Sequence, residues 1–311
     1  MKASPPYHGF MPLPDRIRIT EVGPRDGLQN ESEVVPTAMK IDFINRLQRS
    51  GVAEVEVSGF VHPKWVPQLS DAVEVFEGIE RVAGVVRSAL VPNEQGWERA
   101  QAAGVDKISV FTAASDAFTQ KNINCSIDES LARFAPVVRS AAAANVPVRG
   151  YVSCAVCCPY AGPIEPERVA EVVHALLELG VSEIDLGDTI GVATPADIER
   201  LLHACGSHVR PADVTLHLHD TGRGALACVL RAMELGVVSF DTSCGGLGGC
   251  PYAPGASGNL ATEDLVACCS LLGVETGVSM SSIRDAAERI ESALRRATVS
   301  SSGRAWGLRH A

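Results

Sequence analysis

The sequence predicts an α/β protein, a single (β/α)8 barrel followed by extra C-terminal helices. Three observations support this fold. Short strand patterns alternate with helical patterns eight times, which predicts parallel strands joined by crossover helices. Four helical patterns end at a glycine that directly precedes a strand. Eight such units in about 270 residues match the size of a TIM barrel.

The predicted strands are short runs with apolar residues at alternate or successive positions. They are Ile17–Val22, Ala53–Ser58, Val85–Leu90, Lys107–Thr112, Val148–Ser153, Glu183–Leu186, Val214–His219 and Val237–Thr242. Helical patterns lie between them at Thr37–Ser50, Asn93–Ala103, Ile127–Ala144, Glu165–Leu179, Pro195–Ser207 and Gly222–Leu235. The glycines at which a helix is expected to stop in the left-handed region are Gly51, Gly104, Gly180 and Gly236.

A doubly wound open sheet is the alternative fold, but its strands would be buried on both faces and almost entirely apolar. Several strands here carry polar residues on one face, such as Glu54 and Glu56 in one strand and Arg149 and Tyr151 in another. This pattern favours a barrel with a polar interior.

The chain is expected to form one domain spanning residues 1–311, with irregular ends at about 1–14 and 300–311. The tail from about Leu271 has a helical pattern that is clearest at Ile283–Ala297.

Composition excludes several classes of partner. The net charge of −10 gives no basic field to attract nucleic acid or an anionic membrane. No run of about 18 apolar residues is present, and the first residues resemble neither a secretory signal nor a transit peptide. A cytoplasmic location with reduced thiols is therefore expected. The Cys154-x-x-Cys157-Cys158 sequence lacks a second pair at zinc-finger spacing, so a zinc or redox site there is disfavoured.

A metal site is predicted in the seventh strand. His217 and His219 alternate with apolar residues, so both side chains project from one face, about 7 Å apart along the strand. Barrel active sites lie at the carboxyl ends of the strands. Asp26, after the first strand, and Asn259, after the eighth, are positioned to add oxygen ligands. Such a nitrogen and oxygen donor set suits Mg²⁺, Mn²⁺, Fe²⁺, Co²⁺ or Zn²⁺.

Other candidate residues follow the same strand ends. Arg25 adjoins Asp26, and a guanidinium beside a metal can stabilise an oxyanion such as an enolate. Glu56 and Asp188 are expected to orient Arg25 or a histidine. Cys250 lies in a glycine-dense loop over the barrel mouth, where a thiol can donate or accept a proton.

Six segments resemble the 3-hydroxy-3-methylglutaryl-CoA (HMG-CoA) lyases of the DRE-TIM metallolyase family, in their bacterial form. The resemblance runs from about Ile17 to Gly277. The arginine–aspartate and H-x-H motifs are shared with related barrel enzymes, including isopropylmalate and homocitrate synthases, whereas the cysteine loop is far narrower in its distribution and selects the lyases. The segments are EVGPRDGLQNE (21–31), SGFVHPKWVP (58–67), KNINCS (121–126), GDTIGVATP (187–195), HLHDT (217–221) and GGCPYAPGASGNLATEDLV (248–266).

The resemblance implies retro-Claisen cleavage of (S)-HMG-CoA to acetyl-CoA and acetoacetate, a step of leucine degradation and ketone-body metabolism. It implies a divalent cation, Mg²⁺ or Mn²⁺, and a cytoplasmic bacterial homodimer that binds an acyl-CoA. The implied roles are cation binding by Asp26, His217, His219 and Asn259, substrate contact by Arg25 and Gln29, proton transfer by Cys250, and support by Glu56 and Asp188. Either His217 or Asp26 is the base that takes the hydroxyl proton.

Three other functions compete with the lyase. A sister carbon–carbon lyase or condensing enzyme would act on a related acyl-CoA or 2-oxo acid, but the Cys250 loop argues against it. An amidohydrolase would carry its H-x-H in the first strand, and too few residues follow His219 for seven further strand–helix units. A protein that only binds a metal or an acyl-CoA is disfavoured because every motif position is filled.

Overall fold

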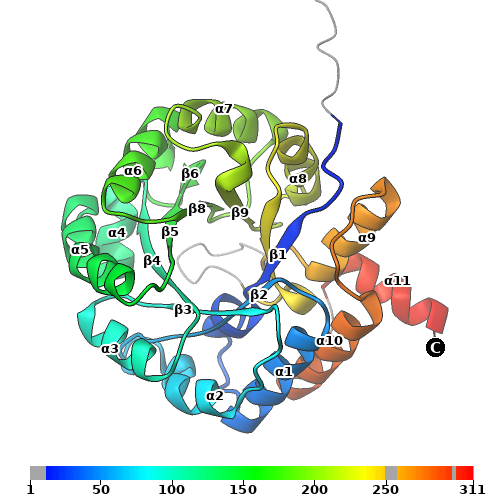
Figure 1. Ribbon diagram of the computed structural model, residues 1–311. Helices are drawn as coiled ribbons and strands as arrows, with labels where there is room; N and C mark the ends of the chain where they lie inside the picture. The colour runs from blue at the N-terminus through cyan, green and yellow to red at the C-terminus, as the bar shows by residue number, and fades with distance from the viewer. Residues whose placement is uncertain (1–11, 249–257, 296–298, 311) are drawn as a thin grey trace, which may run out of the picture.

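The computed structural model describes residues 12–248, 258–295 and 299–310 and confirms the predicted barrel. Eight parallel strands close in the order β1-β10-β9-β8-β5-β4-β3-β2, and Figure 1 looks down their ring. Each overlaps one predicted strand. They are β1 (Arg18–Glu21), β2 (Glu54–Gly59), β3 (Val86–Leu90), β4 (Lys107–Ala113), β5 (Val148–Ser153), β8 (Glu183–Asp188), β9 (Val214–Leu218) and β10 (Ser239–Thr242).

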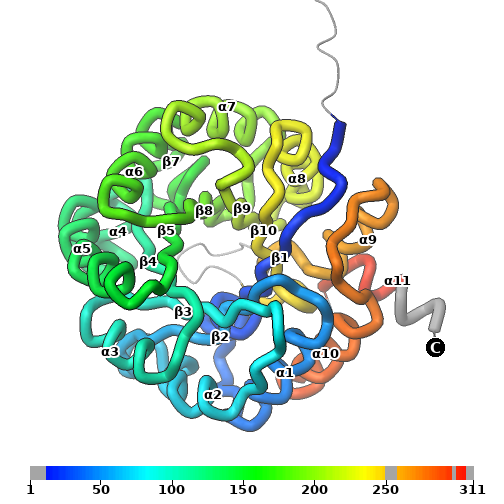
Figure 2. Tube along the Cα trace, viewed as in Figure 1, coloured from blue at the N-terminus to red at the C-terminus, as the bar shows by residue number. Residues whose placement is uncertain are grey.

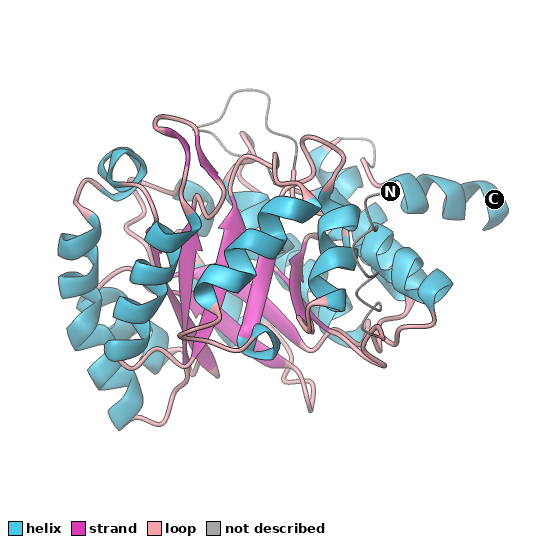
Figure 3. Cartoon of the chain, turned by 90° about the horizontal axis from the view of Figure 1, so that it is seen from above, coloured by secondary structure: helices cyan, strands magenta, loops and turns pink. Residues whose placement is uncertain are grey.

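Helices surround the strands, as the side view in Figure 3 shows. Most of them place an apolar face on the outer surface of the barrel in one continuous core, whereas the last helix packs on α9 (Thr262–Leu272). They are α1 (Thr37–Arg49), α2 (Ala72–Gly78), α3 (Glu94–Ala102), α4 (Asp116–Ile123), α5 (Ile127–Ala143), α6 (Pro166–Glu178), α7 (Pro195–Cys205), α8 (Ala225–Glu234), α9 (Thr262–Leu272), α10 (Met280–Leu294) and α11 (Ser301–His310). Among the helices of these described ranges, none is long and apolar enough to cross a membrane.

The four glycines that were expected to end helices do so in the left-handed region. Gly51, Gly104, Gly180 and Gly236 have φ between 71° and 96°, a backbone conformation that is costly for residues with a Cβ atom. At Gly51 a Cβ would also lie 2.2 Å from the Gly277 carbonyl oxygen. These turns fix where each helix gives way to the next strand.

A small hairpin stands at the carboxyl end of the barrel and was not predicted. Its strands, β6 (Cys157–Cys158) and β7 (Gly162–Pro163), pair antiparallel after β5. The two-residue strands are too short to show a periodic pattern in sequence. The described cysteines are all free thiols, and none belongs to a candidate metal cluster among the described residues.

The C-terminal end differs from the irregular tail predicted at 300–311. Residues Ser301–His310 form α11, because the Asp264 side chain of α9 accepts bonds from its first turn. The Asp264 Oδ1 atom lies 2.7 Å from the Ser302 backbone nitrogen and 3.0 Å from the Ser300 hydroxyl. A carboxylate there satisfies helix-end N–H groups from a distant part of the chain, which a local sequence pattern does not reveal.

The described start of the chain is held against the segment between α9 and α10. Ile17 donates its backbone N–H to the Glu275 carbonyl oxygen, and Glu275 donates to the Asp15 carbonyl oxygen, both at 2.9 Å. Figure 2 shows the blue start and the orange segment on the same side of the barrel. Beside them, α10 packs on α1. The helices beyond β10 therefore belong to the same body as the barrel.

Charged side chains fill the interior of the barrel. Arg149 of β5 is 1% exposed, and its guanidinium lies 2.7 Å from Glu183, 3.1 Å from Asp241 and 3.3 Å from Glu54. Lys107 of β4 lies 2.6 Å from both Glu54 and Glu183. These ion pairs confirm the polar interior that the strand pattern predicted and form a floor beneath the carboxyl end.

A second buried acidic group links β1 to the segment that follows β10. Both oxygens of Glu21 are used: Oε1 accepts from the backbone N–H groups of Gly23 and Cys244, and Oε2 from the Thr262 hydroxyl at 2.6 Å. Burial outweighs these bonds and raises the Glu21 pKa from 4.5 to about 8. The carboxyl is therefore mostly neutral in the folded protein at pH 7.

We expect Glu21→Gln to remove a pH dependence of stability. Because the folded state holds the Glu21 proton more tightly than the unfolded state, the stability that this group contributes is complete below about pH 4.5. It falls as the pH rises towards 8, by up to about 1.4 kcal/mol per pH unit. Glutamine mimics the neutral carboxyl, so the unfolding free energy of the variant, measured by chemical denaturation, should increase relative to that of the parent protein as the pH increases.

Glu288→Gln is the matched control, because Glu288 lies on α10 with a side chain that is 67% exposed. Unfolding free energies of the parent, Glu21→Gln and Glu288→Gln proteins would be measured between pH 5 and 8. If the unfolding free energies of the parent and Glu21→Gln proteins changed with pH in the same way, the result would contradict a neutral Glu21 carboxyl in the folded protein.

Candidate active site

A π-helical turn after β1 presents Arg25 and Asp26 to the barrel mouth. The turn spans Gly23–Gly27, and the Gly27 N–H donates to the Val22 carbonyl oxygen five residues earlier. A Cβ at Gly23 would lie 2.7 Å from Glu21 Oε1, and one at Gly27 would lie 2.8 Å from Leu247 Cβ. Glycine is therefore required at both ends of this turn, which is a form found mostly at functional sites.

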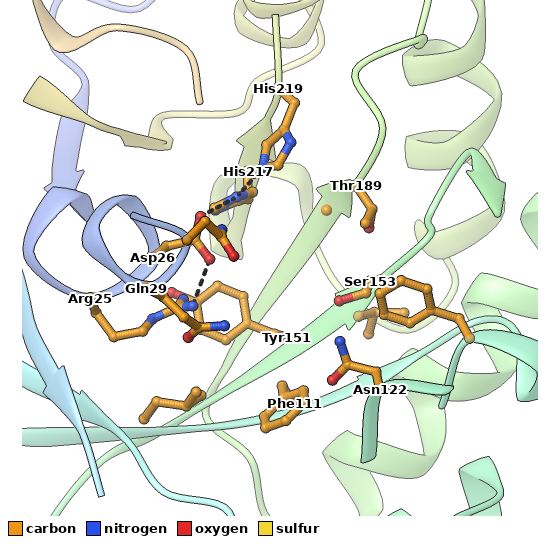
Figure 4. A pocket seen from close by; sticks show the side chains of 15 residues that line it. Arg25, Asp26, Gln29, Phe111, Asn122, Tyr151, Ser153, Thr189, His217 and His219 are labelled. Atoms are coloured by element: carbon orange, nitrogen blue, oxygen red, sulfur yellow. Dashed lines mark hydrogen bonds and ion pairs between the residues drawn. The ribbon is translucent and has the colours of Figure 1, made fainter. Parts of the chain in front are cut away.

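The two histidines at the end of β9 meet Asp26, as the sequence predicted. The Nε2 atoms of His217 and His219 are 3.3 Å apart, and Asp26 Oδ2 lies 3.8 Å from His217 Nε2. Their candidate ligand atoms all lie within 4.8 Å of one another. Figure 4 shows the three side chains converging above the interior of the barrel.

Asn259 is brought to the same point by backbone pairing. Asn259 forms a β-bridge with His219, and the Leu260 N–H donates to the Leu218 carbonyl oxygen at 2.9 Å. The Asn259 amide nitrogen donates to Asp26 Oδ2 at 2.9 Å and to the Leu247 carbonyl oxygen at 3.1 Å. The amide oxygen is then the atom left to act as a ligand, in agreement with the predicted oxygen donor.

This donor set fits a divalent cation. Burial, followed by repulsion from His217, lowers the His219 pKa to about 4, so that imidazole is neutral at pH 7. Burial opposes the charge on Asp26, but Arg25 and the two histidines outweigh it and hold the Asp26 pKa well below its usual range. Within the described residues, His219 Nδ1 is buried without a hydrogen-bond partner. A neutral imidazole beside an ionised carboxylate is the protonation state that metal ligands require.

Arg25 is fixed beside these groups by its own neighbours. Its Nε donates to Glu56 Oε2 at 2.5 Å and its Nη1 to Asp26 Oδ1 at 2.7 Å. The guanidinium also lies over the Tyr151 ring, 5.4 Å from the ring centre. Glu56 in turn accepts from the Ser109 hydroxyl at 2.6 Å. Glu56 thus orients Arg25, as predicted.

Asp188, at the end of β8, has described hydrogen bonds to the loop that follows it and none to Arg25 or to either histidine. Asp188 Oδ2 accepts from the Ala193 backbone N–H at 2.8 Å, and the backbone groups of Gly191 and Val192 also bond to this carboxylate. Burial outweighs these bonds and raises the Asp188 pKa. Asp188 therefore holds the loop between β8 and α7 through Oδ2, while Oδ1 is buried without a partner among the described residues, and its support of the site stays a prediction.

Cys250 lies outside the described residues, which include only the two ends of its loop. At one end Gly248 has a φ of 115°. At the other, a Cβ on Gly258 would lie 2.1 Å from the Gly246 carbonyl oxygen. Both ends require glycine, and the second end leads directly into Asn259.

A cavity of about 130 Å³ opens beside the convergent groups. Gln29, a predicted substrate contact, lines it. Other lining residues were not named as site residues from the sequence because they come from separate strands and loops. These are Phe111, Asn122, Tyr151, Ser153 and Thr189, all labelled in Figure 4.

A larger groove of about 820 Å³ adjoins this cavity. The two share Gln29, Asn30, Leu90, Phe111 and Asn122. The outer part of the groove is lined by His62, Trp65, Lys121 and Arg133, and the Trp65 side chain is 84% exposed. The groove therefore leads from solvent to the convergent groups past aromatic and basic side chains.

Comparisons with known proteins agree with this geometry. The HMGL-like family model matches residues 16–290. The chain is 50% identical over 288 residues to the human cytoplasmic 3-hydroxy-3-methylglutaryl-CoA lyase, covering 93% of this chain and 78% of that protein.

Two solved structures are similar over nearly the whole chain. The hydroxymethylglutaryl-CoA lyase from Pseudomonas aeruginosa superposes with a TM-score of 0.94 at 45% identity, covering 96% of this chain and 100% of that one. An HMG-CoA lyase from Acinetobacter baumannii, in complex with coenzyme A and 3-methylmalate, has a TM-score of 0.90 at 37% identity, covering 94% and 95%. The chain therefore belongs to the HMGL-like family of carbon–carbon lyases.

Proposed function

We propose that this protein cleaves (S)-3-hydroxy-3-methylglutaryl-CoA to acetyl-CoA and acetoacetate with the help of Mg²⁺ or Mn²⁺. The observation that carries the proposal is the convergence of Asp26, His217 and His219 beside an oriented Arg25 at the carboxyl end of the barrel. Relatives named HMG-CoA lyase at about 50% identity support the same activity.

The residues that would hold the cation are Asp26, His217, His219 and Asn259. A bound divalent cation supplies Lewis acidity and a fixed point at which substrate oxygens are held. A carboxylate, an amide oxygen and two imidazoles leave coordination positions open for a chelating substrate. The tertiary hydroxyl of HMG-CoA and a neighbouring carbonyl or carboxylate oxygen suit those positions.

Cleavage begins when the tertiary hydroxyl loses its proton to Asp26, because His217 is placed to use Nε2 for the cation and Nδ1 for its bond to Asp241. The oxygen then forms the ketone of acetoacetate as the C2–C3 bond breaks, and the bonding electrons pass to the thioester as an enolate. Arg25 stabilises the enolate oxygen, since Glu56 and Asp26 hold its planar fork in place before the reaction. The Cys250 thiol then donates a proton to the enolate carbon, which gives acetyl-CoA.

The adjoining groove is proposed to hold the coenzyme A part of the substrate. Lys121 and Arg133 offer positive charge for phosphates, and the exposed Trp65 ring offers an apolar face for the adenine. The relative solved with coenzyme A supports an acyl-CoA substrate. The groove joins the cavity at Gln29 and Asn122, so the thioester end of an acyl-CoA can reach the cation position.

The wider setting is proposed on the family resemblance. An enzyme with this activity acts in leucine degradation and supplies acetoacetate to ketone-body metabolism. A cytoplasmic homodimer remains the prediction for its location and assembly.

The proposed activity is tested by measuring acetoacetate release from HMG-CoA. We expect turnover to stop when the purified protein is stripped with a chelator, and to return when Mg²⁺ or Mn²⁺ is added. Related 2-oxo acids with acetyl-CoA serve as the control substrates for a condensing enzyme. Full activity in a verified metal-free preparation would contradict the cation site, and turnover of only the control substrates would contradict the lyase.

Arg25→Lys should lower kcat for HMG-CoA by at least about 100-fold, the scale of losing one oxyanion donor. Lysine keeps the charge but cannot hold Glu56 and Asp26 and also reach the enolate with a planar fork. Arg87→Lys is the matched control, because Arg87 is a buried arginine that pairs with Asp106 rather than with the candidate site. A folded Arg25→Lys protein with near-normal kcat would reduce Arg25 to a structural role.

Cys250→Ala discriminates the lyase from its sister enzymes. An ordinary thiol, with a pKa of about 8.5, stays mostly protonated at pH 7 and can donate to carbon. We expect the variant to keep its fold and Mn²⁺ affinity while kcat falls steeply. Cys268→Ala, on α9, is the control for a cysteine outside the candidate site. Parent-like cleavage by the Cys250→Ala protein would remove Cys250 as the proton donor.

A further inference from the structure

A pair of buried carboxyl groups lies directly beneath His217, and the proposed reaction does not use it. Asp185 of β8 and Asp241 of β10 are 0% and 2% exposed. Together with His217 they place three possible ligand atoms within 4.8 Å of one another. Neither carboxyl group is among the proposed cation ligands, so the pair must have another role beside His217.

These groups do not form a second cation site, because the Arg149 guanidinium already occupies the space beside them. Arg149 Nη1 lies 3.1 Å from Asp241 Oδ1 and 3.6 Å from Asp185 Oδ2. A metal ion in that space would face a fixed positive charge in a low-dielectric interior, where like charges repel strongly.

Asp241 accepts hydrogen bonds at both of its oxygens. Oδ1 receives the bond from Arg149, while Oδ2 lies 3.2 Å from the Tyr151 hydroxyl and 3.1 Å from His217 Nδ1. Arginine has only donors, so Asp241 Oδ1 accepts, and a carboxyl group paired with a guanidinium is ionised and carries no proton to donate from Oδ2. His217 must then supply the proton in its own bond and carry it on Nδ1.

Asp185 is the second carboxyl group of the pair and lies beside Asp241. Within the described residues neither of its oxygens receives a hydrogen bond. Burial, followed by the charge of Asp241, raises the Asp185 pKa well above its usual range. A protonated Asp185 can donate to Asp241, which makes Asp241 the acceptor for three neighbours besides His217.

The protonation of Nδ1 determines what His217 offers to the cation. With the proton on Nδ1, the Nε2 atom carries a lone pair and points at His219 Nε2 and Asp26 Oδ2, 3.3 and 3.8 Å away. With the proton on Nε2 instead, an N–H group would fill the cation position. Only one of the two neutral forms of the ring can therefore be a ligand.

We propose that Asp241 is a positioning residue that locks His217 in the Nδ1–H form and so keeps Nε2 available as a metal ligand. Arg149 and Tyr151 hold the carboxylate at both oxygens, so that it cannot turn away from the histidine. This inference deepens the proposed function and rests on its cation site, but it concerns a residue of the barrel floor rather than a ligand.

Asp241→Asn tests the role without changing the shape of the side chain. The asparagine side chain has one oxygen and one NH₂ group. An NH₂ group pointing at Arg149 would face one hydrogen-bond donor, and an NH₂ group pointing at Tyr151 and His217 would face two donors. Asp185→Asn is the matched control, because it exchanges the neighbouring buried carboxyl for an amide at a residue that has no described hydrogen bond to His217. We expect the Mn²⁺ dissociation constant to rise about 10- to 100-fold in Asp241→Asn, the usual effect of removing a group that orients a ligand, and by less than about threefold in Asp185→Asn.

A second measurement reads the ring directly and needs no metal or substrate. In the metal-free protein with ¹⁵N-labelled histidine, NMR should show His217 protonated on Nδ1, its signals being identified by their loss in His217→Gln. Asp241→Asn should shift the proton to Nε2. A neutral His217 ring with its proton on Nε2 rather than on Nδ1 in the parent protein would overturn the proposal even if Asp241→Asn does not fold.

The two measurements also separate this inference from the cation site. A parent protein that shows the Nδ1–H form but binds no Mn²⁺ would leave the positioning of His217 in place and contradict the cation site. An Asp241→Asn protein with parent-like Mn²⁺ affinity and an unchanged ring would overturn the role of Asp241.

Discussion

The site depends on the buried cluster of charges centred on Arg149. One guanidinium inside the barrel pairs with Glu54, Glu183 and Asp241, which come from three different strands. Removing one partner of such a buried pair typically costs about 3–5 kcal/mol, a large share of the stability of a protein. The cluster therefore closes the barrel interior and gives the residues above it a fixed base.

Two successive sets of contacts position the functional residues above this base. Asp241 and Tyr151 contact the Arg149 cluster and in turn touch His217 and Glu56. Glu56 then orients Arg25 beside Asp26. His217 and Arg25 are thus each held by a group that meets neither substrate nor cation, which is the arrangement required for electrostatic preorganisation.

The strand order and the main candidate ligands could be predicted from the sequence because their signals are local. Alternating apolar residues around His217 and His219 predict a strand, and the glycine after each of four helical patterns predicts where the helix ends. Both signals lie within a few residues of one another in the sequence. Asp241 could have been found by the same alternation, since Ser239 and Asp241 lie two residues apart in β10. Three features could not be predicted from the sequence, because each depends on partners that only the folded chain brings together. They are the Asp188 bonds, the hairpin after β5 and the capping of α11 by Asp264.

The central claim is that two imidazoles and two oxygen ligands converge on one cation. Pulsed electron paramagnetic resonance on the Mn²⁺-loaded protein measures the number of directly bound nitrogens through their magnetic coupling to the metal. The account predicts coupling from two imidazole nitrogens, reduced to one in a folded His219→Ala protein. Coupling from no nitrogen, or an unchanged spectrum in His219→Ala, would contradict it.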